Sequence, residues 1–575
     1  MPSRIPQDIE RQAFDVIVVG AGINGAGIAR DAAMRGLRVL LLDKGDISSG
    51  TTQWATRLIH GGLRYLEYYE FALVRESLRD REAILHIAQH LVKPLGFLVP
   101  IYERSSRRPL IIRLGMNLYD VLSYDRSMDR HKMLSRKKVQ DREPGLNPEG
   151  LKAAAFYYDA QVEYAERIAV ECAISARDNG ATVITYAKVE HLIIESGDVK
   201  GVKFTDVFSG ERYAVHAPVT VNVAGPWVDE VLADLEGHGT EENDERFIGG
   251  TKGSHLIVDP FPGAPEGEAL YVEARKDGRP YFIVPWNGRY LIGTTDLRYE
   301  GDLDYVSASE EEIQYLLDET NYVIPEARLS RDDVLYTYAG VRPLPHNPEG
   351  ETSGVTRSHV VFDHAKGDTE AGGKMKRSRA ELPQVGGLLS VVGGKLTTYL
   401  NLSRQTVDAV FKKLGRKAPK STSRKVPLPG SETSDFEAFA AGFKSASTIP
   451  EFLSDRLLKL YGVRAAEVLQ VGEDDPELLT PLSPIESVET ALIGAEVIWA
   501  FREEMAQTLS DVLLRRTMAG YGPRVGLDVA DAAAEVAVKH FGWDGERAER
   551  EVREYREWIE RYTPKEFRDH EVSRV

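Results

Sequence analysis

The stretch FDVIVVGAGINGAGIARDAAMRGLRVLLLD, residues 14–43, decides the fold of this chain. Its apolar run at 16–19 predicts a buried parallel strand, because strands covered on both faces are apolar throughout. A helical pattern follows, and a second apolar run at 39–42 ends in the acid Asp43. This order of strand, helix, strand and acid predicts a βαβ unit that binds a dinucleotide.

Three glycines form the G-x-G-x-x-G turn between the first strand and the helix. Gly20 permits the tight turn, Gly22 lets a pyrophosphate approach the backbone, and Gly25 lets the helix pack close to the strand. The N–H groups and the dipole of the helix N-terminus then face the phosphates. Asp43 is placed to accept hydrogen bonds from a ribose.

A hydroxyl-rich loop after the second strand favours FAD over NAD. The loop reads SSGTT at 48–52 and is followed by RLIHGGLRY at 57–65. Small hydroxyl side chains satisfy pyrophosphate and ribitol oxygens without bulk, and Gly61 and Gly62 let the backbone approach a flat ring. We therefore expect FAD as the cofactor.

Further motifs give the chain a resemblance to the FAD-dependent glycerol-3-phosphate dehydrogenases, strong over about residues 14–405 and weaker beyond. The motifs are TKGSH from Thr251, IGTTD from Ile292, YAGVRPL from Tyr338, TRSH from Thr356, GGKLTTY from Gly393 and DVLLRRT from Asp511. Three segments depart from the family. The family has serine-rich sequence and a lysine where this chain reads QWATR at 53–57, Ala-Thr-Gly where this chain reads VAG at 223–225, and a commonly acidic pair where this chain reads EY at 163–164.

The resemblance implies an α/β fold in three parts. We expect a Rossmann-like FAD-binding domain of the glutathione-reductase/D-amino-acid-oxidase type, a mixed α+β cap over the substrate, and a C-terminal all-α domain. The expected boundaries are 14–70, 151–235 and 384–405 for the FAD-binding domain, 71–150 and 236–383 for the cap, 406–431 for a linker, and 432–575 for the helical domain.

Composition excludes several classes of site and partner. The net charge of −17 argues against nucleic acid as a partner. A single cysteine, Cys172, cannot form a disulfide or an iron–sulfur site, unlike the anaerobic branch of the family. His86 and His90 have the spacing of two imidazoles on one helix face, but no glutamate follows His86 as H-E-x-x-H requires, so we expect no metal.

The resemblance also implies the site residues. Cofactor contacts are expected from Gly20, Gly22, Ile23, Asn24, Gly25, Asp43, Lys44, Ser49, Thr51, Thr52, Arg57, His60, Gly61, Gly62, Gly225, Gly394, Leu396 and Thr397. Substrate contacts are expected from Arg64, Tyr65, Asp296 and Arg357. The catalytic candidates are His255, Arg342 and Lys395.

The chemistry of each side chain explains why it is a catalytic candidate. A neutral imidazole at His255 can take the hydroxyl proton, and His60 is an alternative for this role. Arg342 can grip phosphate oxygens or polarise the hydroxyl. A positive charge on Lys395 can stabilise an anionic reduced flavin. Asp296 is expected to hold an arginine in place.

The predicted reaction is oxidation of sn-glycerol 3-phosphate to dihydroxyacetone phosphate, with hydride transfer from C2 to FAD and electrons passed to a membrane quinone. One alternative is an oxidase that uses oxygen, although the insertion of the longer oxidases is not evident. Another is an oxidoreductase of 2-hydroxy acids or amino acids. A flavin-carrying binding protein is disfavoured, because such a protein would not need the whole set of candidate side chains.

Location and assembly are less constrained by the sequence. No apolar run approaches the ~20 residues that span a bilayer, so we expect a cytoplasmic chain. Residues 104–122, RSSRRPLIIRLGMNLYDVL, combine arginines with apolar side chains and suit a peripheral helix on the cytoplasmic membrane face. The same pattern also fits a helix packed on the protein core. The sequence does not decide whether the protein forms a homodimer.

Overall fold

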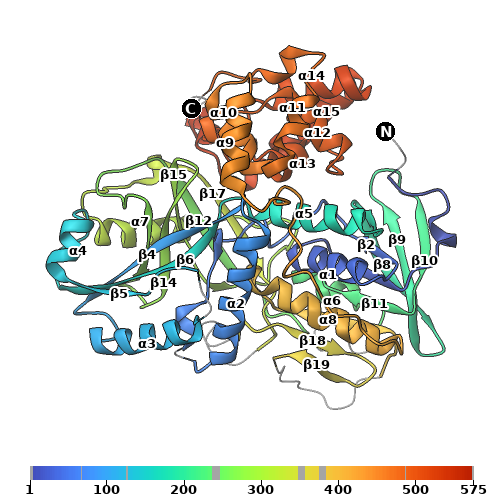
Figure 1. The fold of residues 1–575 in the computed structure, drawn as a ribbon, viewed down its shortest axis with the longest axis horizontal. Coiled ribbons are helices and arrows are strands. Elements are labelled where there is room, and N and C mark those ends of the chain that lie inside the picture. The colour runs from blue at the N-terminus through green and yellow to red at the C-terminus, as the bar shows by residue number, and fades with distance from the viewer. Residues whose placement is uncertain are drawn as a thin grey trace.

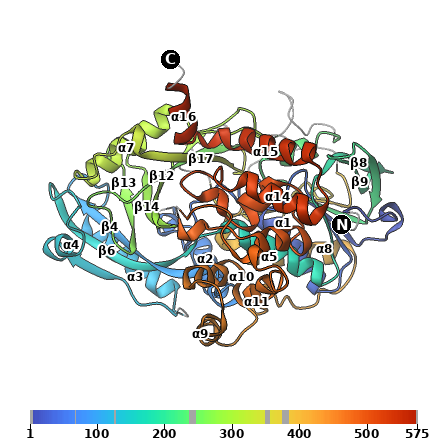
Figure 2. The ribbon, with the colours of Figure 1, turned by 90° about the horizontal axis from the view of Figure 1, so that it is seen from above.

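The computed structural model describes residues 4–66, 68–124, 127–235, 246–347, 356–373, 384–485 and 487–572. Two β-rich parts lie side by side, and a helical part covers them from one side (Figure 1). Seen from above, helices α14 and α15 lie over the middle of the molecule, near α1 (Figure 2). This arrangement confirms the predicted fold class: a Rossmann-like sheet, a mixed cap and a C-terminal helical domain.

The first part is a seven-stranded sheet with the order β19-β18-β20-β11-β1-β2-β7. Strands β1, β2, β7, β11 and β20 run parallel, and β18 and β19 add an antiparallel edge. Helix α1 (Ile23–Met34) packs against α5 (Ala165–Asp178) and α8 (Tyr399–Lys413). The strands are β1 (Val16–Val19), β2 (Val39–Leu42), β7 (Thr182–Ile184), β11 (Val219–Asn222), β18 (Val360–Asp363), β19 (Asp368–Gly372) and β20 (Leu388–Val392).

Burial explains why the central strands have no alternating pattern. Every residue of β1, β2, β11 and β20 is buried, because α1, α5 and α8 cover one face of this sheet and side chains of residues 187–235 cover the other. The predicted strands at 16–19 and 39–42 are therefore confirmed at the predicted residues.

The second part is a ten-stranded mixed sheet with the order β16-β12-β15-β14-β13-β4-β6-β3, to which β17 and β5 add by pairing with β12 and β6. Its strands are β3 (Leu58–Ile59), β4 (Val92–Tyr102), β5 (Lys132–Ser135), β6 (Leu151–Val162), β12 (Thr251–Val258), β13 (Glu268–Glu273), β14 (Pro280–Trp286), β15 (Arg289–Gly293), β16 (Leu297–Arg298) and β17 (Val334–Arg342). The helices around it are α2 (Phe71–Ile87), α3 (Pro109–Leu122), α4 (Arg136–Arg142) and α7 (Glu310–Val323).

A small three-stranded sheet and the helical domain complete the chain. The sheet contains β8 (Ala187–Glu195), β9 (Asp198–Asp206) and β10 (Arg212–His216), and α6 (Val228–Val231) follows β11. The C-terminal helices are α9 (Phe436–Ala446), α10 (Glu451–Tyr461), α11 (Ala465–Gln470), α12 (Gly494–Arg502), α13 (Leu509–Asp511), α14 (Ala530–Phe541), α15 (Gly545–Ile559) and α16 (Lys565–Val572).

The sheets divide the chain differently from the expected boundaries. Strands β3 and β6, expected in the FAD-binding domain, belong to the ten-stranded sheet. Strands β18 and β19, expected in the cap, belong to the seven-stranded sheet. The reason is that strand pairing joins residues far apart in the chain, and local sequence does not specify the partner.

The expected linker at 406–431 is not a free connection. Helix α8 continues to Lys413, and the segment after it is anchored on the dinucleotide domain. The buried guanidinium of Arg30 donates to the carbonyls of Ser423 and Val426. Asp80 on α2 holds Arg424. Polar contacts, which the composition alone did not indicate, fix this segment in place.

The two histidines spaced as on one helix face do not share a helix. Helix α2 ends at Ile87, and His90 lies beyond it. His90 is buried between Ser431 and Glu171, at 2.8 and 3.0 Å. No group of three or more metal-ligating side chains forms in the part of the chain that the structure describes.

Candidate active site

The glycine turn after β1 has the geometry that the sequence predicts. Gly20 has a φ of +112°, which L side chains rarely adopt. A Cβ on Gly25 would stand 1.7 Å from the carbonyl oxygen of Gly20, so only glycine allows this approach of helix and strand. Gly22 is the N-cap of α1, and no side chain caps that end. The N-terminus of α1 is therefore built as an anion site.

The loop after β2 is tied to this turn. The Asp43 carboxylate accepts hydrogen bonds from the N–H groups of Ala21 and Gly45, at 2.5 and 2.8 Å. The Thr52 hydroxyl oxygen accepts from the N–H of Ile23, the first residue of α1, at 3.1 Å. The strand-end acid and the hydroxyl loop therefore lie beside the glycine turn, as a dinucleotide site requires.

The glycine turn at 20–25 and the loop at 43–52 form a concave site, here called the cradle. Buried polar atoms without partners indicate that this cradle fits a polar cofactor. Asn24 Oδ1 and Ser48 Oγ are buried and have no hydrogen-bond partner among the described residues. Gly225 has a φ of +59°, and a Cβ there would meet no atom within 4 Å. Open space and unused acceptors beside the glycine turn are what a bound dinucleotide would fill and satisfy.

Two motifs far apart in sequence meet where the flavin ring is expected. The N–H of His60 donates to the Thr397 hydroxyl at 3.1 Å, which joins the RLIHGG and GGKLTTY segments. The N–H of Gly61 donates to the hydroxyl of Tyr119 on α3 at 3.1 Å. A Cβ on Gly394 would stand 2.9 Å from Asn24 Nδ2, so the last motif also reaches the start of α1.

The remaining backbone positions of the expected cofactor set lie in the same segments. Gly62 has a φ of +77° and lies in the loop before the 3₁₀ turn at 63–66. Leu396 begins a 3₁₀ turn that leads into α8. A Cβ on Gly45 would stand 2.8 Å from the hydroxyl oxygen of Ser49, which places that side chain within the loop.

Three residues of the expected cofactor set have side chains that bind protein groups in the structure. Arg57 is completely buried and forms an ion pair with Glu166, away from the glycine turn. Lys44 Nζ binds Asp304 at 2.6 Å. The Thr51 hydroxyl donates to the Val341 carbonyl at 2.7 Å. The partner of Arg57 could not be identified from the motif, because Glu166 lies more than 100 residues later in the chain.

A cavity of about 220 Å³ opens between the segment at 56–65 and the ten-stranded sheet. The expected substrate residues Arg64, Tyr65, Asp296 and Arg357 all line it, together with Arg342 and His60. Four arginines and two carboxylates are among its lining residues, so positive charge is in excess. Such a cavity suits a small dianion.

Asp296 organises two of these arginines. Its two carboxylate oxygens accept from Arg342 Nη1 at 3.2 Å and from Arg357 Nη2 at 3.3 Å. Arg342 Nη2 also donates to the Thr294 hydroxyl at 3.0 Å. Burial favours protonation of Asp296, but the charges of Arg342 and Arg357 together hold its pKa below the ordinary value. The carboxylate is therefore ionised and fixes both guanidinium groups, as the sequence predicts.

His255 lies behind the wall of the cavity. It is 2% exposed and packs on Tyr338, with ring centroids 4.7 Å apart. Its Nε2 is 2.9 Å from the hydroxyl of Thr56, and Thr56 itself lines the cavity. Burial, with the charges of Arg342 and Arg57, lowers the pKa of His255 well below its usual value. The imidazole is neutral at physiological pH and reaches the cavity through Thr56.

His60 and Lys395 flank the same region. Burial lowers the pKa of His60 to about 4, so this imidazole is also neutral. Lys395 Nζ donates to the Ser77 hydroxyl at 2.6 Å and lies 4.4 Å from the centre of the Tyr65 ring. Burial lowers the pKa of Lys395 to about 8. Tyr65 separates this ammonium group from the arginine cluster.

Sequence reasoning missed several residues of the cavity, among them Arg279, Phe282 and Thr56. Arg279 precedes β14 and donates to the backbone carbonyl of Asp296, and Phe282 lies on that strand. Thr56 joins the cavity to His255. Arg279 and Phe282 stand outside the family-like motifs, so no local signal marks them, whereas Thr56 lies within the departing segment at 53–57.

Profiles of two known families match the chain over most of its length. The profile described as FAD dependent oxidoreductase matches residues 15–367. The profile described as C-terminal domain of alpha-glycerophosphate oxidase matches residues 421–548. The two matches correspond to the two β-rich parts and to the helical domain.

Individual relatives extend the match to nearly the full chain. A glycerol-3-phosphate dehydrogenase of Synechocystis is 44% identical over 561 residues, which cover 96% of this chain and 97% of the relative. An aerobic glycerol-3-phosphate dehydrogenase of Staphylococcus aureus is 30% identical over 92% of both chains. The crystal structure of a Bacillus halodurans glycerol-3-phosphate dehydrogenase complexed with FAD superposes with a TM-score of 0.73 at 27% identity over 96% of both chains.

The L-alpha-glycerophosphate oxidase of Mycoplasma pneumoniae, solved with FAD bound, shares the fold at a TM-score of 0.53 and 15% identity, over 73% of this chain and 99% of that one. The glycine turn, the open cradle beside it and the full-length relatives agree on the cofactor and on the family. This chain belongs to the family of FAD-dependent glycerol-3-phosphate dehydrogenases.

Proposed function

We propose that this protein oxidises sn-glycerol 3-phosphate at C2 to dihydroxyacetone phosphate. The observation that carries the proposal is the pairing of Arg342 and Arg357 with Asp296. These side chains line a cavity that opens beside the loop at 57–65, which we call the flavin loop. FAD bound in the cradle supplies the hydride acceptor. The relatives named glycerol-3-phosphate dehydrogenase support the choice of substrate.

The arginines are proposed to bind the phosphate and leave the glycerol part free to face the flavin loop. Planar guanidinium groups match phosphate oxygens, and fixing them on Asp296 orients them before substrate arrives. Arg64 and Arg279 line the same cavity. A 2-hydroxy acid would not need this many cations, so the lining favours a phosphorylated alcohol.

The hydroxyl proton is proposed to reach His255 Nε2 by way of the Thr56 hydroxyl. The 2.9 Å contact between these two groups supports the route, and a neutral imidazole can accept the proton. His60 lines the cavity directly and remains the alternative acceptor. The ammonium group of Lys395 is proposed to stabilise negative charge that develops on the reduced ring.

A membrane quinone is proposed as the electron acceptor, reached by a protein that lies on the bilayer surface. Helix α3 supports this, because Leu110, Ile111 and Leu114 are 66%, 54% and 58% exposed. Arg108 directly precedes this helix and Arg113 lies within it. An exposed apolar face with arginines beside it suits the headgroup region of a membrane. In the described ranges, no helix is long and apolar enough to cross a bilayer.

Oxygen is the second candidate acceptor. It is favoured by the match of residues 421–548 to the C-terminal domain of alpha-glycerophosphate oxidase. Oxygen uptake with substrate, measured with and without a soluble quinone analogue, separates the two. Rapid uptake with peroxide formation and no response to the quinone would favour the oxidase.

The substrate is tested by anaerobic mixing of the yellow protein with sn-glycerol 3-phosphate, glycerol or 2-hydroxyglutarate. We expect the visible flavin absorbance to bleach with glycerol 3-phosphate alone. Arg342→Ala should weaken this response by about 10-fold to 150-fold in apparent affinity, since a charge-assisted contact is worth about 1.5–3 kcal/mol. Bleaching by glycerol, or unchanged bleaching of the Arg342→Ala variant, would contradict the phosphate site.

A further inference from the structure

The loop between β2 and β3, residues 43–57, has two faces. One face holds the dinucleotide cradle: Thr52 accepts from the N–H of Ile23, and the N–H of Ser48 donates to the Ala21 carbonyl at 3.0 Å. The other face meets the C-terminal helical domain through Asp46, Gln53 and Arg57. The helical domain therefore contacts the same loop that lines the cradle.

The first contact is a buried cluster of charges around Asp46. Its Oδ2 receives Arg515 Nε at 2.6 Å and Arg516 Nη1 at 2.8 Å, and its Oδ1 receives Arg516 Nη2 at 2.8 Å. Asp46, Arg515 and Arg516 are 1%, 2% and 0% exposed. Asp511 binds Arg515 at 2.6 Å and balances the second positive charge. Such a cluster is strong only while every charge keeps its partner.

The backbone of the helical domain is shaped for this contact. Arg515 and Arg516 belong to the π-helical turn η10 (Val512–Arg516). Consecutive residues of a regular α-helix point about 100° apart. Here both guanidinium groups converge on one carboxylate. Irregular turns of this kind are frequent at functional positions.

Gln53 and Arg57 extend the contact along the loop. Gln53 Nε2 donates to the hydroxyl of Tyr562 at 2.7 Å, and its Oε1 accepts from Arg515 at 3.3 Å. The Arg57 guanidinium lies 4.8 Å from the centre of the Tyr521 ring. Tyr521 donates to Glu166, the partner of Arg57, at 2.7 Å.

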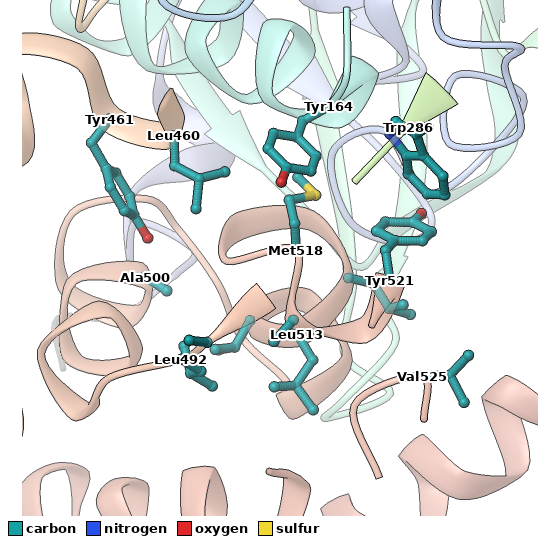
Figure 3. Close-up of a cluster of buried hydrophobic side chains, with 14 of the residues drawn as sticks. Tyr164, Trp286, Leu460, Tyr461, Leu492, Ala500, Leu513, Met518, Tyr521 and Val525 are labelled. Atoms are coloured by element: carbon teal, nitrogen blue, oxygen red, sulfur yellow. The ribbon is translucent and has the colours of Figure 1, made fainter. Parts of the chain in front are cut away.

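Figure 3 shows the apolar side of this contact, where Tyr521 lies next to Trp286 of β14 and Met518 points toward Tyr164. Gln53 and Arg57 lie in the 53–57 segment that departs from the family pattern. The departure therefore falls on residues that face the helical domain.

We propose that the C-terminal domain holds the 43–57 loop in its FAD-binding conformation, with Asp46 as the positioning residue. The anchors at 46, 53 and 57 alternate with the residues that face the cradle and the cavity, so a loop released from η10 would lose the geometry of both. FAD binding and docking of the helical domain are then linked, and each stabilises the other.

The test measures the affinity of the apo-protein for FAD by quenching of flavin fluorescence. Tyr562→Phe removes the partner of Gln53 without changing charge, and we expect the dissociation constant to rise about threefold to tenfold, as the loss of one buried hydrogen bond predicts. Asp46→Asn should raise it by more than about tenfold.

Two control variants are matched to Tyr562→Phe and Asp46→Asn. Tyr555→Phe removes a buried hydroxyl of the same domain, which is bonded to the Val525 carbonyl at 2.5 Å rather than to the loop. Asp31→Asn removes a buried carboxylate from Arg35 near the other end of α1. Both should bind FAD as the wild type does. Equal affinities in Tyr562→Phe, Asp46→Asn and the two controls would overturn the proposal.

Hydrogen exchange provides a second readout that does not depend on the folding of Asp46→Asn. In the wild type, addition of FAD should slow exchange at residues 509–517, which the structure places outside the cradle. In Tyr562→Phe this protection should be smaller. Exchange at 509–517 that does not respond to FAD in the wild type would also overturn the proposal.

Discussion

At the residue scale, most of the charged groups of the site are paired within the protein. Asp296 holds Arg342 and Arg357, and Lys395 donates to Ser77. Pairing fixes the position of each group and tunes its pKa, as is typical of functional sites. Lys395 is the group whose ionisation changes in an accessible range, since its pKa is about 8.

The pH dependence of flavin reduction follows from Lys395. Its folded-state pKa is lowered by burial, so the ammonium form is present below pH about 8 and is lost as pH rises through that value. If this charge stabilises the reduced flavin, the rate constant of anaerobic reduction should fall above pH about 8. Stopped-flow measurements from pH 6 to 10 would show the decline.

Lys395→Arg is the matched variant, because a guanidinium stays charged throughout this range. Its profile should lack the decline, even if its absolute rate is lower. A decline at the same pH in Lys395→Arg would assign the ionisation to another group.

At the element scale, local motifs were predictable and pairings were not. The βαβ unit at 14–43 was predicted correctly, since Gly20, Gly25 and the two apolar runs act within one short stretch. Strands β18 and β19 were placed in the wrong domain, because their partner β20 is fixed by the fold and not by nearby sequence. Likewise the sequence around Arg57 does not indicate its partner Glu166, because that residue lies on α5 more than 100 residues later.

Helix α3 connects an exposed apolar face with the flavin loop. Its outer side carries Leu110 and Leu114, while Tyr119 on its inner side reaches Gly61 and Asp159. Figure 1 shows α3 at the edge of the cap, on the side away from the helical domain. This placement leaves the outer face free to meet a flat surface.

Membrane binding is therefore predicted to depend on α3. The double variant Leu110→Ser/Leu114→Ser should lose most of its sedimentation with phosphatidylglycerol-containing vesicles, because burial of these side chains drives interfacial binding. Ile194→Ser on β8, a residue 42% exposed, is the control and should bind as the wild type does. Retained sedimentation of the double variant would remove α3 from the proposed contact surface.

At the scale of the whole molecule, the cap and the helical domain share one hydrophobic interior, and a buried ion pair ties the dinucleotide domain to the helical domain. A single hydrophobic cluster runs from the cap, through Tyr336 and Trp286, into the helical domain at Leu513 and Tyr521. Arg167 on α5 reaches Glu504 of the helical domain at 2.6 and 2.9 Å, and both are buried. We infer that the parts unfold together.

Glu504→Gln tests this cooperativity. It leaves the buried Arg167 without its main partner, which costs about 3–5 kcal/mol and should lower the Tm of both the apo- and the FAD-loaded protein in one transition. Glu310→Gln breaks an exposed pair with Arg331 and should leave the Tm nearly unchanged. Two separate transitions in Glu504→Gln would show that the helical domain unfolds independently.

The order of these contacts along the chain has a consequence for biosynthesis. The flavin site joins Thr397 to His60, and the cradle loop meets Arg516 only near the C-terminus. A ribosome must therefore translate past Arg516 before the proposed anchors of the cradle loop can form. On the proposal that the helical domain holds this loop, tight binding of FAD is a late step of maturation, and a chain that ends before residue 509 should retain the flavin less well.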